Sequence, residues 1–490
     1  MVPDARGHGP CQWRLLRLGR RNNSMETMSR DSAISAIEGY FDDGDFMQDL
    51  ARRVAIRTES PEPERRPELY HYLTDEMTPY LQAIGFECEI HENPRADAGP
   101  LLVATRTEGA DLPTVMTYGH GDVVRGYDDQ WREGLNPWEI TVEGERWYGR
   151  GTADNKAQHT INLAAMKAVI EARGSLGFNV VALIETGEEC GSPGLKEFCV
   201  ANKDLFKADV FIASDGPRLQ PGMPTVFMGS RGVFNFKMSL ELRDGGHHSG
   251  NWGGLLANPG VIMSHALASV VDAKGKLLIE DWRPEPMTNS VRRAIAKLEV
   301  GGGDDAPEID PEWGEPGLTP EEKVFGWNTF EIRAFETGNP RNPVNAIPPR
   351  AVAYGHIRYV VGTDPMGFLP ALRKHLDAQG FENIELTAER DFMNATRLDP
   401  DHPWAQWAIK SIETTAKQEV AVLPNLGGTL PNDVFAEILG LPTIWVPHSY
   451  AGCSQHAPNE HVLAPVCRSA LQIMTGLWWD LGDGKTPAST

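Results

Sequence analysis

Basic residues are scarce in this 490-residue sequence. Lys and Arg together number 46 against 68 Asp and Glu, which gives a formal net charge of −22. Because phosphate groups and anionic lipids are bound chiefly by Lys and Arg, this balance argues against a general nucleic-acid-binding protein and against a membrane-docking surface. No run of 18 apolar residues occurs, so no membrane span is predicted. We therefore expect neither a nucleic-acid nor a membrane partner, and a cytoplasmic location.

Cysteine is also sparse, and no Cys-x-x-Cys pair occurs. The six cysteines are Cys11, Cys88, Cys190, Cys199, Cys453 and Cys467. In a long chain, scattered cysteines predict reduced thiols, and neither a disulfide framework nor a thiolate zinc site. There is no Gly-x-Ser-x-Gly elbow, and no base is evident for Cys190 or Cys453. A serine or cysteine hydrolase is therefore disfavoured.

The first 24 residues differ in composition from the rest of the chain. Their five arginines face a single acid, Asp4. The arginines interrupt the apolar stretch, so the segment does not have the pattern of a signal peptide. We predict a disordered leader over residues 1–27. Initiation at Met25 or Met28 is a hypothesis that the intact mass of protein made from the native gene would test; a mass that includes residues 1–24 would contradict it.

The hydrophobic pattern alternates between strands and helices over much of the chain. Helices are predicted over residues 31–57, 66–84, 156–172 and 404–416, and strands over 88–91, 101–105, 114–118, 177–184, 208–213 and 443–446. Strands that alternate with helices predict an α/β sheet with parallel members.

The pattern changes near residue 233. Residues 233–242 alternate as in a half-exposed antiparallel strand. Strands at 351–361 and 384–387 and a helix at 370–379 follow a Gly-, Pro- and acid-rich loop at 300–320. The sequence therefore predicts one α/β domain, residues 28–232 and 393–490, interrupted by an α+β domain over 233–392.

Polar residues follow several of the apolar runs. The segments are His120-Gly-Asp122, Asp154 in GRGTADNK, Glu188-Glu189 in ETGEECGS, Asp215 in ASDGP and His456 in SQHAPNE. Each alone is more typical of a turn, a cap or a solvated side chain, but sites in open α/β sheets lie at the carboxyl ends of strands, where these segments can converge. Histidine and carboxylate ligands suit borderline and hard divalent metals, and two such ions need a bridging carboxylate.

The motifs also have a recognisable order. His120-Gly-Asp122, GRGTADNK, GEECGSPGL, ASDGP, HHSG…GG…NP, NAIPPRA and HAPNEH occur between about residues 40 and 480. Together they resemble the di-zinc metallopeptidase family of aminoacylase, carnosinase, acetylornithine deacetylase and succinyl-diaminopimelate desuccinylase. The resemblance implies a zinc-peptidase-like catalytic domain with a mixed, mostly parallel sheet, interrupted by an inserted α+β dimerisation (lid) domain.

The resemblance implies two divalent metal ions per subunit, with zinc first and manganese or cobalt as alternatives. His120, Asp154 and Asp215 would bind one ion, and Glu189, His456 and the same Asp154, as a bridge, would bind the other. Asp122 matches the residue that orients the first histidine. Glu188 matches the general base, which acts on a bridging water. The bond between Asp154 and Asn155 lies where the family has a cis peptide.

The inserted domain matches the family at further positions. His248 matches a histidine that reaches the partner subunit's active site in a homodimer and stabilises the oxyanion there. Its offset to Ser249-Gly250 favours it over His247. Asn345 and Arg358 match positions that hold the substrate carboxylate or the scissile carbonyl. An ordinary turn residue and an ordinary strand arginine are their structural alternatives. The segment Gly427-Gly428-Thr429 resembles the glycine loop that lines the substrate carboxylate in the carnosinase branch.

Two positions depart from the family pattern without removing a ligand. Arg125 stands where the family often has proline, and Cys190 where an apolar residue is frequent. The aromatic run Trp131, Trp138, Trp147 and Tyr148 is expected to pack in the core, with a substrate wall as the alternative.

The predicted activity is hydrolysis of an amide bond in a small N-acyl amino acid or dipeptide. A ureido or carbamoyl amidohydrolase, or a deaminating hydrolase of the same family, is the alternative, and the products would separate the two. A non-catalytic binding module is disfavoured because Glu188 and all five expected ligands are present.

Overall fold

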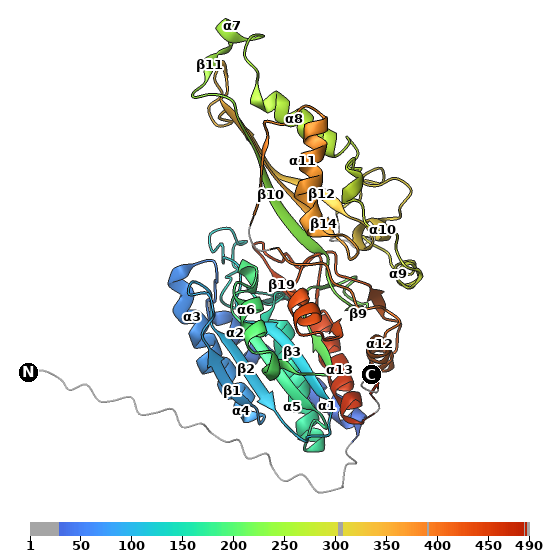
Figure 1. Ribbon diagram of the computed structural model, residues 1–490. Helices are drawn as coiled ribbons and strands as arrows, with labels where there is room; N and C mark the ends of the chain where they lie inside the picture. The colour runs from blue at the N-terminus through green and yellow to red at the C-terminus, as the bar shows by residue number, and fades with distance from the viewer. Residues whose placement is uncertain (1–28, 302–306, 390–391, 485, 488–490) are drawn as a thin grey trace, which may run out of the picture.

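The computed structural model describes residues 29–301, 307–389, 392–484 and 486–487. The predicted leader, residues 1–27, lies outside this part of the chain. Figure 1 shows two stacked regions, with a large sheet in the lower one and a smaller sheet in the upper one.

The large sheet has eight strands in the order β1-β2-β6-β3-β7-β17-β9-β16. Their bounds are β1 (Glu87–His91), β2 (Leu101–Arg106), β6 (Asn179–Glu185), β3 (Thr114–His120), β7 (Val210–Ala213), β17 (Thr443–Trp445), β9 (Thr225–Phe227) and β16 (Ala421–Leu423). The pairings β6–β3, β3–β7, β7–β17 and β9–β16 are parallel, and the other three are antiparallel. The predicted α/β class, with a mixed and mostly parallel sheet, is confirmed.

Both faces of this sheet are buried, because successive strand residues enter different cores. In β3, Val115 belongs to one hydrophobic cluster and Met116 to another. The first cluster includes residues of α1 (Arg30–Asp42), α5 (Lys156–Arg173), α12 (Pro403–Ala416) and α13 (Ala464–Gly482). The second includes residues of α6 (Leu195–Ala201) and the π-helical η7 (Val434–Ile438). The sheet is therefore the middle of three layers, and polar side chains reach solvent mainly from its edges and strand ends.

The predicted helix over residues 31–57 is wrong as a single element. It ends after α1, and α2 (Asp45–Ala55) begins beyond Gly44, whose φ of 87° is left-handed. Glycine adopts that conformation without a steric penalty, so the chain turns there. Residues 66–84 are α3 (Arg66–His71), the π-helical η2 (Tyr72–Met77) and α4 (Thr78–Ala83).

The upper sheet is antiparallel, in the order β12-β14-β10-β15. It consists of β12 (Thr329–Thr337), β14 (Arg350–Tyr359), β10 (Gly232–Glu241) and β15 (Glu385–Ala388), and α8 (Pro259–Val270) and α11 (Phe368–Ala378) share a third core with one of its faces. Side chains on the opposite face, such as Asn235 and His356, are only half-buried. The limits of the inserted domain, 233–392, stay a prediction.

Short elements complete the described chain. They are the three strands β4 (Thr141–Glu143), β5 (Arg146–Tyr148) and β19 (His461–Leu463), the pair β8 (Pro217–Arg218) and β18 (Ser449–Tyr450), the pair β11 (His247–His248) and β13 (Ala346–Ile347), and α7 (Ser249–Trp252), α9 (Asn289–Ile295) and α10 (Pro320–Phe325). Single 3₁₀ turns are η1 (Pro63–Arg65), η3 (Glu188–Cys190), η4 (Lys203–Phe206), η5 (Glu280–Trp282) and η6 (Pro365–Gly367). The five described cysteines are free thiols. No helix in the described ranges is long and apolar enough to cross a membrane.

Candidate metal centre and substrate site

The predicted metal ligands meet at the carboxyl ends of three neighbouring parallel strands. His120 is the last residue of β3, Asp215 comes two residues after β7, and Glu189 lies in η3, just beyond β6. Asp154 precedes α5, and His456 lies in the loop before β19. Strand order places β3 between β6 and β7, so these segments converge on one edge of the sheet.

The five side chains form two groups that share Asp154. In one group, His120 Nε2 lies 2.9 Å from Asp154 Oδ1 and 3.6 Å from Asp215 Oδ2. In the other, His456 Nε2 lies 3.0 Å from Asp154 Oδ2 and 2.9 Å from Glu189 Oε2. Within each group the ligand atoms lie within 4.8 Å of one another. Each oxygen of Asp154 faces a different histidine, which is the arrangement a bridging carboxylate requires.

Asp122 connects the first histidine to the glutamate pair. Its Oδ1 lies 3.4 Å from His120 Nδ1, and its two oxygens accept hydrogen bonds from the backbone N–H groups of Glu188 and Glu189, at 3.2 and 3.1 Å. Ser60 donates a further hydrogen bond of 2.7 Å to the same carboxylate. Asp122 therefore fixes the ring of His120 and the backbone of η3 at once.

The loop that carries Asp154 is held by a glutamate that sequence reasoning missed. Glu460 is buried, and one of its oxygens accepts hydrogen bonds from the backbone N–H groups of Gly151, Ala153 and Asp154, at 3.0, 2.9 and 3.1 Å. Its other oxygen accepts a 2.7 Å hydrogen bond from Arg150. The peptide bond between Asp154 and Asn155 is cis, as the resemblance implied. Glu460 occurs in HAPNEH, but no local pattern identifies its partners, which lie about 300 residues earlier.

Burial and mutual repulsion give the carboxylates unusual acidities. Burial first, and then the charge of Asp154, raises the pKa of Glu189 to about 7 and raises that of Asp215. Burial also raises the pKa of Glu188 well above its usual range. Asp154 first, and then Glu189, raises the pKa of His456 to about 11. The carboxylates of this site therefore repel one another, and a bound cation would stabilise their charged forms.

The donor atoms fit a divalent metal centre. Two imidazole nitrogens and three carboxylates are the ligands that zinc and similar ions take, and no thiolate is among them. Asp215 Oδ2 is buried and has no hydrogen-bond partner among the described residues. An orphaned carboxylate oxygen that faces a histidine is the expected position of a metal ligand.

The predicted substrate residues separate into two sets. Arg358 Nη1 donates a 2.5 Å hydrogen bond to Thr429 Oγ1, so β14 meets the loop that contains the exposed Gly428. His248 and Asn345 instead lie together at the far tip of the upper region, at β11 and next to β13 (Figure 1). The structure does not bring His248 or Asn345 to the metal ligands of the same chain.

The two departures from the family pattern have simple surroundings. Arg125 pairs with Glu62, and the exposed Cys190 lies 3.5 Å from Ser60 Oγ. Within the aromatic run, Trp147 is buried in the first core and stacks on Phe41, which fits core packing.

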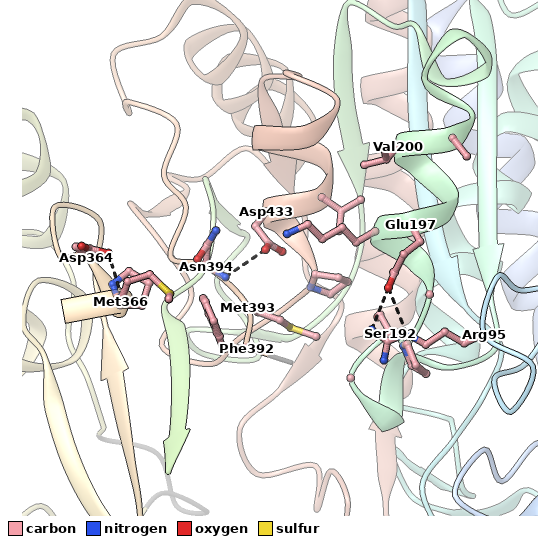
Figure 2. Close-up of a pocket in the computed structure, with 18 residues that line it drawn as sticks. Arg95, Ser192, Glu197, Val200, Asp364, Met366, Phe392, Met393, Asn394 and Asp433 are labelled. Atoms are coloured by element: carbon pink, nitrogen blue, oxygen red, sulfur yellow. Dashed lines mark hydrogen bonds and ion pairs between the residues drawn. The ribbon is translucent and has the colours of Figure 1, made fainter. Parts of the chain in front are cut away.

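A separate cavity of about 880 Å³ lies between the two regions (Figure 2). Its wall combines α6 and the preceding segment with residues 364–366, 392–394, 431, 433 and 434. Figure 2 shows Glu197 paired with Arg95 on one side and Met366 on the other. The lining of this cavity includes Gly191, directly after η3, but none of the five predicted ligands.

Comparison with known proteins agrees with this geometry. Peptidase family M20/M25/M40 matches residues 116–480. The Beta-Ala-His dipeptidase of Mus musculus is 30% identical over 448 residues, which cover 85% of this chain and 89% of that protein. The cysteinylglycine-S-conjugate dipeptidase of Corynebacterium striatum is 26% identical over 370 residues, 72% of this chain and 77% of that protein.

Solved structures show that the fold is shared. The M20 family metallo-carboxypeptidase Sso-CP2 from Sulfolobus solfataricus superposes with a TM-score of 0.76 at 24% identity, covering 89% of this chain and 99% of that one. Human carnosine dipeptidase 1 gives a TM-score of 0.74 at 22% identity, covering 93% and 99%. The resemblance drawn from the motifs is confirmed, and the chain belongs to peptidase family M20/M25/M40 as a metallopeptidase-type hydrolase of C–N bonds.

Proposed function

We propose that this protein is a di-metal dipeptidase that cleaves a dipeptide, or a small N-acyl amino acid, with a free carboxylate. The observation that carries the proposal is the pair of ligand groups that share Asp154. Two relatives are named as dipeptidases, one for Beta-Ala-His and one for cysteinylglycine S-conjugates. These names support a dipeptide over an N-acyl amino acid as the substrate. A cytoplasmic location stays a prediction from composition.

Two divalent cations are proposed for the centre, with zinc first and manganese or cobalt as alternatives. His120, Asp154 and Asp215 would hold one, and Asp154, Glu189 and His456 the other. When bound, the cations would polarise the amide carbonyl and lower the pKa of an attacking water.

Glu188 is proposed as the general base. It adjoins a ligand in η3, yet it belongs to neither ligand group, so its carboxylate is free to exchange a proton. Burial first raises the pKa of Glu188 above its ordinary value, and a carboxylate with a raised pKa is a stronger base toward a proton of water, which it can return to the leaving nitrogen.

A homodimer is proposed in which His248 and Asn345 complete the partner's site. Both are exposed and lie far from the ligands of their own chain (Figure 1). The edge strand β12 is exposed along most of its length, and Ile332 and Phe335 on it are 44% and 42% exposed. An exposed edge with apolar side chains is a surface on which a second strand can pair.

The substitution Glu188→Gln tests this proposal, together with a panel of dipeptides and N-acyl amino acids. Loss of a general base is expected to lower kcat by about 10² to 10⁴-fold while the metal content stays unchanged. Glu197→Gln, at an exposed glutamate paired with Arg95, is the matched control. Turnover of Glu188→Gln like that of the unmodified protein would contradict the role. Release of ammonia with carbon dioxide, or of ammonia alone, would point instead to carbamoyl hydrolysis or deamination.

A further inference from the structure

Two arginines lie side by side at the end of the upper sheet that meets the loop at residues 427–429. Arg231 directly precedes β10, and Arg358 lies on β14 opposite Val233. Because paired residues and those two apart point to the same face, Arg231 and Arg358 are diagonal neighbours on the open face of the sheet. Sequence reasoning singled out Arg358 and missed Arg231.

Both arginines are anchored to the same loop. Arg231 Nε donates a 2.7 Å hydrogen bond to the carbonyl of Gly427, while Thr429 Oγ1 donates to the carbonyl of Arg231 at 2.8 Å and accepts from Arg358 at 2.5 Å. Each anchor uses one nitrogen of the guanidinium group, which has five N–H donors. The remaining donors are held in place beside the loop.

The loop adjoins the metal centre. Leu426, which precedes Gly427, packs against Gly216, where an added Cβ would lie 3.3 Å from Leu426 Cδ2. Gly216 follows the predicted ligand Asp215. The loop that anchors the two guanidinium groups therefore contacts the residue that follows a predicted metal ligand.

The arginine pair has an excess of positive charge. In the described part of the chain, neither Arg231 nor Arg358 is in an ion pair, and Glu331 is the carboxylate close enough to affect Arg231. Burial first, and then the charges of Arg358, Arg333 and Arg231, lowers the pKa of His356 to about 4. A pair of half-buried like charges is costly unless an anion binds there.

We propose that Arg231 and Arg358 form a two-guanidinium subsite that selects substrates whose C-terminal residue is acidic. This assignment rests on the proposed dipeptidase function, and it names the class of dipeptide that the enzyme prefers. Arg358 binds the α-carboxylate, and Arg231 binds the side-chain carboxylate of a C-terminal Asp or Glu. Each guanidinium fork can present two N–H groups to one carboxylate, which favours arginine for this contact.

The wild-type test compares isosteric substrate pairs that differ in one charge. Metal-loaded enzyme is assayed with glycyl-aspartate against glycyl-asparagine, and glycyl-glutamate against glycyl-glutamine. The acidic member of each pair is expected to have a kcat/KM about tenfold or more higher, mainly through KM, because a charged hydrogen bond is lost in the amide. The preference should decrease as salt increases. Equal efficiency within both pairs would overturn the inference.

Arg231→Gln is expected to bring the ratio within each pair close to one, and Arg231→Lys to keep part of the preference. Arg333→Gln is the matched control, since Arg333 occupies the same sheet but is already paired with Glu389. The ratio compares two substrates on one preparation, so partial unfolding lowers both rates and leaves it unchanged. A preference that persists in Arg231→Gln would overturn the role of Arg231.

The same experiment distinguishes failure of the proposed arginine subsite from failure of the proposed dipeptidase function. Cleavage of all four dipeptides without an acidic preference would leave the dipeptidase proposal standing and remove the subsite. Failure to cleave any of them would contradict the dipeptidase proposal itself and, with it, the subsite.

Discussion

The two sheets carry opposite charge where they bear predicted site residues. At the carboxyl ends of the large sheet, Asp154, Glu189 and Asp215 crowd together around His120 and His456. On the open face of the small sheet, Arg231 and Arg358 lie together without an ion pair among the described residues. The charge of the acidic end suits cations, and the charge of the basic face suits an anion.

The difference shows why the net charge of −22 says little about the substrate. A negative surface disfavours anions on average, but a local pair of arginines beside the proposed cation centre would reverse the sign of the charge at the proposed substrate site.

Removal of divalent ions should have the largest effect, and on the acidic end alone. Chelation is expected to reduce hydrolysis to background and to lower the melting temperature, since an ion present at 1,000 times its Kd contributes about 4 kcal/mol to stability. Hydrogen exchange should increase in residues 150–155 and 454–460 and change little in β10 and β14. Readdition of zinc, manganese or cobalt should restore activity. Full activity in metal-free protein would contradict a metal centre.

His248→Ala tests whether the upper region completes the partner's site. Loss of one group that stabilises the developing oxyanion is expected to lower kcat by about 10² to 10³-fold. Mixing this variant with Glu188→Ala subunits should restore activity, because each mixed dimer has one intact site. His247→Ala, at the neighbouring residue, is the control. No recovery after verified subunit exchange would count against the trans arrangement.

Glu460→Gln should weaken metal binding at the acidic end, because Glu460 holds the loop that carries Asp154. The amide keeps one oxygen but loses the charge that pairs with Arg150 and attracts three backbone N–H groups. Disturbing such an outer contact is expected to lower metal affinity by about 10 to 100-fold, measured by calorimetric titration. Glu143→Gln, at a half-exposed glutamate paired with Arg132, is the control. A lower melting temperature with unchanged metal affinity would show that Glu460 only stabilises the fold.

The smallest effect concerns His356 on the basic face. Its pKa of about 4 in the folded protein lies below the ordinary value of 6.5. As the pH falls, the folded state therefore binds this proton only at a lower pH than the unfolded state does. Stability should therefore decrease as pH falls from about 6.5 to 4. Arg358→Gln removes a neighbouring positive charge and should raise this pKa, as measured by NMR titration. A pKa near 6.5 in the unmodified protein would contradict a positive potential on this face.

The sequence was sufficient to predict which residues form the candidate metal centre, because they lie in short motifs, most of them directly after apolar strands. His120, Glu189 and Asp215 each follow or end a buried run, and strand order alone brings them together. Their roles as ligands stay a prediction until metal is measured. Glu460 and Arg231 could not be found in this way. Their partners are backbone groups hundreds of residues away, and no local pattern encodes such contacts.

The elements missed from the sequence share a physical cause. Helix α13 is buried around most of its surface, including Trp478, so its apolar residues show little helical periodicity. Strand β12 is exposed on both faces after Phe330, so it lacks the alternation of a half-buried strand. Apolar periodicity appears where one face of an element contacts the core and the other contacts solvent. Neither α13 nor most of β12 has two such different faces.

Glu460 also sets the order in which the centre can be completed. It and His456 come from the last 35 residues of the chain, whereas the loop that they hold begins at Arg150. During synthesis, a chain that has reached Asp215 already contains four of the five predicted ligands, but neither the second histidine, His456, nor the Glu460 carboxylate that holds the loop of Asp154. If these residues bind metal as proposed, both ions can be held only after the carboxyl-terminal segment has been made, and a chain truncated before His456 would lack a complete centre.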